Sequence, residues 1–332
     1  MSHIRGTLFV ENGLLKNKIF SPELNEKITF KHSKYISIKE EFKKHGIVLD
    51  TQDISPPESS RFTIYLDNIY KPKSKKNYLI VREPPIIIPK NHNLKQLQVF
   101  DKVFTWNDDI VDKKKYIKFY NQSYDFNKIK IEKYKNKKDG YVLVCSNKIA
   151  FGKGENYSLR NKVIDYFEGN NKKFELYGWG WEKKRFQSRI IEVVLNRMEL
   201  LRPKNKILTN YRGTIKNKRE TCSKYKFQFS IENSNSTNGY ITEKIFDSFF
   251  SDTIPIYSGT PNIDNYIPND CFINLNRFSS INELISYTES LNDNDIDLIK
   301  KNRDKFLNSK KSEIFSSEYN SRIICTNIIN DI

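Results

Sequence analysis

The chain has 332 residues and a formal net charge of +17, and its hydrophobic content of 37% is sufficient for packed cores. At about 150 residues per domain, this length predicts two domains. No apolar run approaches the roughly 18 residues that cross a bilayer, and the first residues lack the apolar core of a signal peptide. The composition excludes a membrane-spanning protein, and we expect a soluble one that is at most peripheral to a membrane.

The excess of positive charge favours phosphate-rich partners, which are nucleic acid, an anionic membrane or a nucleotide sugar. A generally basic, solvated surface explains the charge equally well. The cysteines are far apart and show no CxxC spacing: Cys145, Cys222, Cys271 and Cys325. This pattern predicts neither a zinc site nor a dense disulfide framework, and it fits a reducing cytosol.

Short apolar or β-branched runs between polar segments predict strands in the first 110 residues. The runs are residues 6–10, 46–49, 62–66, 78–81 and 103–106. We predict helices over residues 37–44, with Ser37 as N-cap, and over residues 94–100. The strand at 78–81 is followed by Arg82 and Glu83 and is ended by Pro84 and Pro85, because proline cannot donate to a ladder.

Residues 112–139 are dense in Lys, Asn and Tyr and predict a linker, with a domain boundary near Asp139 and Gly140. Basic residues interleaved with aromatic ones can also bind phosphates and stack bases. A basic nucleic-acid-binding protein therefore stays as an alternative of another class. No recognised nucleic-acid motif accompanies this stretch, so we expect no nucleic-acid partner.

In the second half, strands are predicted at residues 141–145, 174–177 and 271–275. Helices are predicted at 159–167, with Ser158 as N-cap, at 190–201 and at 281–290. We expect Trp179 and Trp181 to pack structurally. Alternating strands and helices indicate an α/β fold with parallel sheets, and two such halves predict two Rossmann-like domains facing a central cleft. The predicted domains are 1–139 and 140–310, with a helical segment 311–332 packing back on the first.

The most informative stretch is residues 225–259, YKFQFSIENSNSTNGYITEKIFDSFFSDTIPIYSG. Residues 227–231 read as a half-buried strand, and Glu232 follows at the strand end, where open α/β sheets bind ligands. Thr242 is a predicted N-cap. The helix that it starts presents unpaired N–H groups and a positive dipole end, which attract anions, and Lys244 adds a full positive charge there.

This order of motifs resembles the donor-binding motif of the α1,3-fucosyltransferase family, in its bacterial-type form. The matching pieces are Tyr-Lys-Phe at 225–227, Glu-Asn-Ser at 232–234, Tyr-Ile-Thr-Glu-Lys at 240–244 and Pro-Ile-Tyr-Ser-Gly at 255–259. The resemblance covers residues 141–278 well and the first 140 residues only loosely. It implies a GT-B fold and an inverting transferase. Because the chain shows no N-terminal anchor like that of Golgi members, we expect a cytoplasmic protein, peripheral to the inner face of a membrane.

The resemblance also implies which residues act. Glu83 would be the base that deprotonates the acceptor, although on context alone a surface carboxylate paired with Arg82 is the simpler interpretation. Arg160 and Lys244 would bind the diphosphate of the donor. Glu243, Asn233 and Tyr240 would contact the nucleotide and ribose, and Glu232 the donor sugar. The structural alternatives are a buried tyrosine for Tyr240 and a strand-end cap for Glu232. Arg212 and Lys218 match family positions without an assigned role.

Two acidic groups offer rival interpretations. Asp108 and Asp109 follow Trp106 and read as a solvated turn or helix start. Residues 293–297 superficially resemble the DxD motif of metal-dependent glycosyltransferases, but a helix-capping loop explains them better. No metal or other cofactor is implied, because basic side chains and helix dipoles can replace the metal in the two-Rossmann class.

The expected function is therefore transfer of L-fucose from GDP-β-L-fucose, with α1,3 or α1,4 linkage, to a glycan that contains N-acetylglucosamine, such as lipopolysaccharide O-antigen. A GT-B glycosyltransferase with another nucleotide sugar or acceptor is the alternative, and a non-catalytic sugar-binding relative is a third possibility. An anionic membrane is a possible peripheral partner.

Overall fold

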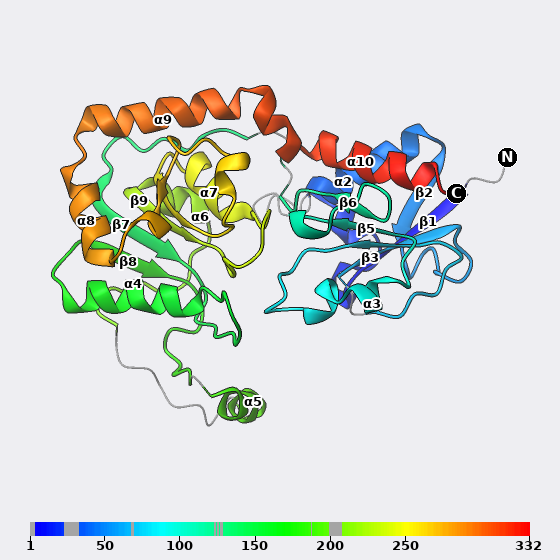
Figure 1. Ribbon diagram of the computed structural model, residues 1–332, viewed down its shortest axis with the longest axis horizontal. Coiled ribbons are helices and arrows are strands. Elements are labelled where there is room, and N and C mark those ends of the chain that lie inside the picture. Colours follow the sequence, from blue (N-terminus) through cyan, green and yellow to red (C-terminus); the bar gives the residue numbers. More distant parts are fainter. Residues whose placement is uncertain are drawn as a thin grey trace. The chain divides into compact units, whose positions relative to one another are not determined.

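The computed structural model describes residues 4–22, 33–67, 70–122, 124, 126, 129–186, 188–198 and 208–332. The chain forms two compact units (Figure 1). The first unit comprises residues 1–129, 237–241 and 307–332, and the second comprises 130–236 and 242–306. The division thus falls ten residues before the expected boundary at 139/140. In addition, five residues from the middle of the donor motif belong to the first unit.

The first unit is built on a six-stranded, all-parallel sheet. Its order is β2 (Ile47–Thr51), β1 (Ile4–Phe9), β3 (Phe62–Leu66), β4 (Asn77–Ile80), β5 (Lys102–Thr105) and β6 (Tyr116–Lys118). Strand β6 lies inside the stretch predicted as a linker, so that prediction is wrong there. A strand of three residues flanked by lysines is too short to show an alternating apolar pattern, yet Tyr116 and Ile117 are buried.

Alternate residues of the central strands pack on opposite faces of this sheet. Ile64 and Ile80 belong to the core beneath helices α2 (Ser33–Lys44) and α10 (Ser317–Ile329), which lie side by side (Figure 1). Tyr65 and Leu79 belong to a second core with Leu97 of α3 (Leu94–Leu97). Both faces are therefore covered, as in doubly wound parallel sheets. Because α2 begins at Ser33, Ser37 lies within the helix, and its predicted capping role is wrong.

The second unit contains a five-stranded, all-parallel sheet. Its order is β11 (Ile273–Asn274), β10 (Ile254–Ser258), β9 (Tyr225–Ile231), β7 (Lys138–Val144) and β8 (Phe174–Tyr177). The helices of this unit are α4 (Tyr157–Gly169), α5 (Arg189–Arg197), α6 (Lys218–Ser223), α7 (Glu243–Phe250), α8 (Ile281–Ser290) and α9 (Asp293–Leu307). Apolar residues of β7, β9 and β10 pack with α4, α8 and α9 in one core. The short 3-10 helices are η1 (Asn12–Leu14), η2 (Lys18–Phe20), η3 (Pro89–His92), η4 (Asp108–Ile110), η6 (Ile263–Asn265), η7 (Leu275–Arg277) and η8 (Lys310–Phe315).

Two helix starts differ from the predictions. Helix α4 begins at Tyr157, and the carboxylate of Glu155 accepts hydrogen bonds from the N–H groups of Tyr157 and Ser158, so Ser158 is not the cap. Helix α9 begins at Asp293, so residues 293–297, predicted as a helix-capping loop, form its first turns. The capping itself is present, because the side chain of Asn292 accepts from the N–H of Asn294. The predicted helix at 190–201 extends partly outside the described residues.

The loop between β9 and α7 supplies the five residues, 237–241, that belong to the first unit. Tyr240 is 2% exposed and packs against Trp106, with the ring centroids 4.7 Å apart. The Asn238 amide donates to Asp109, and the Asn238 carbonyl accepts from the N–H of Asp108. Gly239 has φ +83°, and a Cβ there would lie 2.3 Å from the Trp106 carbonyl oxygen. This close approach requires glycine.

In the part of the chain that the structure describes, no helix is both long and apolar enough to span a membrane. All four cysteines are free thiols.

Candidate functional site

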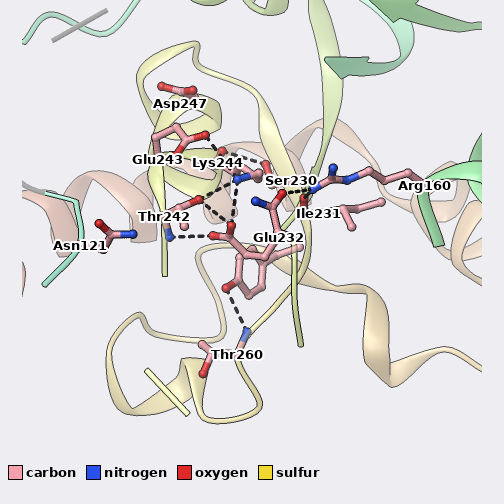
Figure 2. Close-up of polar contacts among 12 residues, drawn as sticks. Asn121, Arg160, Ser230, Ile231, Glu232, Thr242, Glu243, Lys244, Asp247 and Thr260 are labelled. Carbon is pink, nitrogen blue, oxygen red and sulfur yellow. Dashed lines mark hydrogen bonds and ion pairs between the residues drawn. The ribbon is translucent and has the colours of Figure 1, made fainter. Parts of the chain in front are cut away.

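The carboxyl end of β9 and the start of α7 bring four of the predicted site residues together in the second unit (Figure 2). Glu232 and Asn233 directly follow β9, while Glu243 and Lys244 form the first turn of α7. The strand ends in the middle of the sheet, between β10 and β7. Ligands of open α/β sheets bind at such strand ends.

Glu232 is the centre of this cluster and is fully buried. One carboxylate oxygen accepts a hydrogen bond from the N–H of Thr242 at 2.7 Å. The other accepts from the Thr242 hydroxyl at 2.5 Å and from the Lys244 ammonium at 3.1 Å. Thr242 therefore occupies the N-cap position without capping α7 through its side chain. Its hydroxyl binds Glu232 instead, and it also accepts from Lys244 at 2.9 Å.

Lys244 holds a positive charge at the amino end of α7. Burial alone would lower the pKa of this ammonium group, but the carboxylates of Glu232 and Glu243 raise its pKa above the ordinary value. Lys244 is therefore charged at neutral pH, and its side chain keeps 19% of its surface exposed. A partly accessible cation beside the N–H groups of a helix start is a favourable place for an anion.

Arg160 reaches the same strand end from α4. Its guanidinium donates to the carbonyl oxygen of Ile231 at 2.7 Å and to the side-chain oxygen of Asn233 at 2.9 Å (Figure 2). Arg160 is only 5% exposed, and its Nε has no hydrogen-bond partner. Among the described residues, no carboxylate forms an ion pair with this guanidinium. A buried, uncompensated positive charge is costly unless an anion completes the site.

The remaining two members are more open. Glu243 has 42% of its side-chain surface exposed, and its carboxylate lies 3.4 Å from the Lys244 ammonium. The Asn233 carbonyl accepts from the N–H of Asn156, so the loop after β9 pairs with the loop after β7. Lys218, unlike Arg160, has a carboxylate partner, since its ammonium lies 2.7 Å from Asp247. Arg212 lies apart, with its guanidinium 3.9 Å from Glu175.

Two residues of the adjacent strand end support this cluster and were missed by the sequence reasoning. Tyr257 is buried at the end of β10, where burial and the charge of Glu232 raise its pKa well above the ordinary value. Its hydroxyl accepts from the N–H of Thr260. Gly259 lies against both, because a Cβ there would be 2.2 Å from the Tyr257 hydroxyl and 2.6 Å from Cγ of Glu232. The family motif ends on this glycine, which was the available signal.

We expect Gly259→Ala to disturb the site, because the added methyl group displaces Tyr257 or Glu232. Overpacking of this kind costs about 1–3 kcal/mol of unfolding free energy. Urea denaturation and calorimetric titration with GDP measure the two effects. Gly169→Ala is the matched control, since a Cβ at Gly169 meets no atom within 4 Å. Equal GDP affinity in both variants would contradict the assigned position of Gly259.

Glu83 lies in the first unit, in the loop that follows β4. Its backbone is held on both sides: its N–H donates to Asp67 at 3.2 Å, and its carbonyl oxygen lies 3.0 Å from Nε2 of His92 and 3.3 Å from the Asn91 amide. Burial lowers the pKa of His92, so its imidazole is neutral at pH 7. Since a carbonyl oxygen only accepts, Nε2 carries the proton.

Asp67 organises this loop and was also missed. It is fully buried and has φ 63°, a left-handed conformation that is uncommon for residues other than glycine. Its Oδ1 accepts from the Arg82 N–H at 2.7 Å and from the Asn91 amide at 2.7 Å. Its Oδ2 accepts from Nε of Arg82 at 2.8 Å, which forms an ion pair. Arg82 therefore pairs with Asp67, and the charges of both Asp67 and Glu83 act to raise the pKa of Arg82.

We expect Asp67→Asn to destabilise the first unit by about 3 kcal/mol, because it removes one partner of a buried ion pair and sets an amide N–H against Nε of Arg82. Asparagine tolerates the left-handed backbone, so backbone strain does not confuse the result. Urea denaturation measures the change. Asp101→Asn is the control, since Asp101 is 28% exposed and pairs with Lys76 at the surface. Equal losses in the two variants would contradict the role of Asp67.

The ring of Tyr240 lies in the core of the first unit against Trp106, which corresponds to the buried-tyrosine alternative. The rival acid Asp108 pairs with Lys118 at 2.5 Å and lies in η4, so it forms part of a helix start. Among the described residues, no group of three or more His, Cys, Asp or Glu side chains could hold a metal ion.

Two all-parallel sheets, each flanked by helices, define the GT-B architecture of glycosyltransferases. A solved α1,3-fucosyltransferase with GDP has this fold with a TM-score of 0.57, at 19% identity, over 100% of this chain and 92% of that one. A DNA-modifying β-glucosyltransferase gives a TM-score of 0.60 at 14% identity, over 98% of this chain and 99% of that one. Identities this low establish the fold alone.

The sequence of the second half matches a family model and curated relatives. Residues 181–326 match the model of glycosyltransferase family 10 (fucosyltransferase), C-terminal region, which confirms the predicted resemblance over this part of the chain. The α-(1,3)-fucosyltransferase FucT of Helicobacter pylori is 43% identical over 77 residues, 23% of this chain and 16% of that protein. An α-(1,4)-fucosyltransferase of Arabidopsis thaliana is 36% identical over 74 residues, 22% and 18% of the two chains. The matched segments thus span less than a fifth of these two relatives.

Proposed function

We propose that this protein is an inverting fucosyltransferase that transfers L-fucose from GDP-β-L-fucose to a glycan containing N-acetylglucosamine, in α1,3 or α1,4 linkage. The observation that carries the proposal is the buried guanidinium of Arg160, which has no carboxylate partner among the described residues and lies at the strand end that also bears Lys244. The name of the family and the titles of the related structures, which include GDP and GDP-fucose, support the choice of donor.

The departure of GDP leaves negative charge on its β-phosphate, and this charge must be stabilised in the transition state. Arg160 offers a planar fork of N–H donors, and Lys244 offers a point charge at the start of α7. Both are held in place before the donor binds, Arg160 by Ile231 and Asn233, and Lys244 by Glu232. We assign no metal to this step, because the two side-chain cations supply the charge.

Glu232 has both carboxylate oxygens engaged by Thr242 and Lys244. We therefore propose that Glu232 positions Lys244 and does not contact the donor sugar. Glu243 and Asn233 are proposed to hydrogen-bond the ribose and the nucleotide. Tyr240 is buried against Trp106, so any contact with the nucleotide would be limited to its hydroxyl group.

Glu83 is the proposed general base. The carboxylate would take the proton of the acceptor hydroxyl as its oxygen attacks the anomeric carbon of fucose, while the bond to the GDP oxygen breaks. The attack inverts the configuration of the anomeric carbon from β to α. Glu83 then releases the proton to solvent and returns to its carboxylate form. Its fixed backbone suits this role, since Asp67, Asn91 and His92 hold both its N–H and its carbonyl.

The acceptor is proposed to be a cell-surface glycan such as lipopolysaccharide O-antigen, modified on the cytoplasmic side of a membrane. The first unit, where the resemblance to the family is loosest, would bind it.

A panel of nucleotide sugars tests the donor. GDP release is measured with GDP-fucose, GDP-mannose, UDP-glucose and UDP-galactose, each with and without N-acetyllactosamine. The proposal expects release with GDP-fucose that rises when the acceptor is added. Turnover confined to another donor would favour the second candidate, a GT-B enzyme of different specificity. Steeply salt-dependent DNA binding that persists in Glu83→Gln, without sugar transfer, would favour a nucleic-acid-binding protein.

A further inference from the structure

Helix α5 (Arg189–Arg197) turns its apolar side chains to solvent. Ile190 is 78% exposed, Ile191 is 45%, Val193 is 47% and Val194 is 48% exposed. Met198, the residue after the helix, is 47% exposed. A helix on the surface of a soluble domain ordinarily buries its apolar stripe. A contiguous exposed group of this kind marks an interaction surface, which we call the α5 face.

One polar residue of the same helix is buried instead. Glu192 is 3% exposed, and its carboxylate accepts from the N–H of Phe186 at 2.6 Å. Its other oxygen lies 3.6 Å from the Arg185 guanidinium. Ser188 caps the helix start by accepting from the N–H of Ile191. These contacts hold Glu192 inward against the segment directly before the helix, while the apolar side chains named above stay exposed.

The surroundings of the α5 face are basic and aromatic. Lys184 and Arg197 are exposed at the two ends of the segment. Trp179, which we expected to pack structurally, is 49% exposed, and the Lys183 ammonium lies 5.1 Å from its ring centroid. Trp181, by contrast, is buried as expected, and its indole donates to the Cys145 carbonyl. Basic side chains flanking an apolar helix face, with an exposed tryptophan earlier in the same segment, are typical of segments that lie in a membrane interface.

From these features we infer that the α5 face docks on an anionic lipid bilayer, with its apolar side chains entering the interface and its basic side chains on the lipid headgroups. A second copy of the chain suits the face poorly. Two molecules of net charge +17 would have to meet through basic rims, and like charges across an interface are unfavourable. One nine-residue helix is also small beside the roughly 800 Å² that each partner buries in a stable interface. An anionic surface complements both the apolar face and its rim.

Vesicle co-sedimentation of the full chain tests the inference. The wild-type protein is mixed with vesicles of phosphatidylcholine alone or of equal parts phosphatidylcholine and phosphatidylglycerol. We expect binding to the anionic vesicles that weakens as salt is raised. We expect Ile190→Ser with Val194→Ser to lower the partition coefficient about tenfold or more. The separate pair Lys184→Ala and Arg197→Ala should lower binding to the anionic vesicles only.

The matched control carries Val99→Ser and Leu298→Ser, two apolar residues that are each 57% exposed elsewhere on the molecule. This control should bind as the wild type does. Thermal unfolding and GDP binding verify that every variant is folded. If the variant with Ile190→Ser and Val194→Ser unfolds, the variant with Lys184→Ala and Arg197→Ala still tests the inference. Failure of the wild type to bind, or equal binding by all variants, would overturn the inference. The inference would also be overturned if the wild type were a dimer in the absence of vesicles and the variant with Ile190→Ser and Val194→Ser were a monomer.

Discussion

Replacing Glu83 by glutamine is expected to abolish measurable fucosyl transfer while leaving GDP affinity nearly unchanged. Glutamine has the shape of glutamate but cannot accept the acceptor's proton, and loss of a general base costs about 10²–10⁴ in rate. The variant should fold, because glutamine keeps the backbone contacts with Asp67, Asn91 and His92. Transfer is measured as kcat and KM for GDP-fucose with N-acetyllactosamine, and GDP affinity by calorimetry.

Glu58→Gln is the control for this experiment. Glu58 belongs to the same unit, is 59% exposed and pairs with Lys73 at 3.2 Å, so its loss should leave turnover intact. Full turnover in Glu83→Gln would show that another group is the base. Loss of both transfer and GDP binding would show that the substitution disturbs more than the proton transfer.

Arg160→Ala is expected to lower kcat/KM for the donor by about 10²–10³, the effect of removing one donor group that stabilises charge in the transition state. The substitution removes a buried cation whose charge no described carboxylate offsets. It also frees the Ile231 carbonyl and the Asn233 side chain. Loss of these hydrogen bonds should cost about 1–3 kcal/mol of unfolding free energy, so the variant stays folded. Initial rates over a range of GDP-fucose concentrations measure the effect.

Arg160→Lys separates charge from geometry, because lysine keeps the charge but loses the planar fork. We expect it to recover only part of the lost activity. Arg277→Ala is the control, since Arg277 is exposed and pairs with Asp264 at 3.3 Å in the same unit. If Arg160→Ala retained wild-type kcat/KM while losing stability, Arg160 would be a structural residue.

The predictions from sequence succeeded where the pattern is local. The apolar runs located β3, β8 and α8 at their observed bounds, because each is framed by polar residues and turn formers. The ordered motif at 225–259 located Glu232 and Lys244, whose chain separation is short. Arg160 needed the family resemblance, since nothing in its own segment distinguishes it from a solvated helix arginine.

The sequence could not reveal contacts between residues that are distant in the chain, nor which face of a helix is exposed. Asp67 reads as an ordinary loop aspartate until the fold brings Arg82 and Asn91 to it. Tyr240 lies inside the donor motif by sequence, yet its ring packs on Trp106, 134 residues earlier. The periodicity of α5 predicts a helix equally well with its apolar face buried or exposed, and the structure shows Ile190 and Val194 exposed and Glu192 buried.

The stereochemistry of transfer tests the central claim most directly. The protein is incubated with GDP-β-L-fucose and N-acetyllactosamine, and nuclear magnetic resonance identifies the anomeric configuration and the linkage of the product. The account predicts an α-linked fucose on a hydroxyl of N-acetylglucosamine, formed with inversion and lost in Glu83→Gln. A β-linked product, or release of free fucose without any fucosylated acceptor, would contradict it.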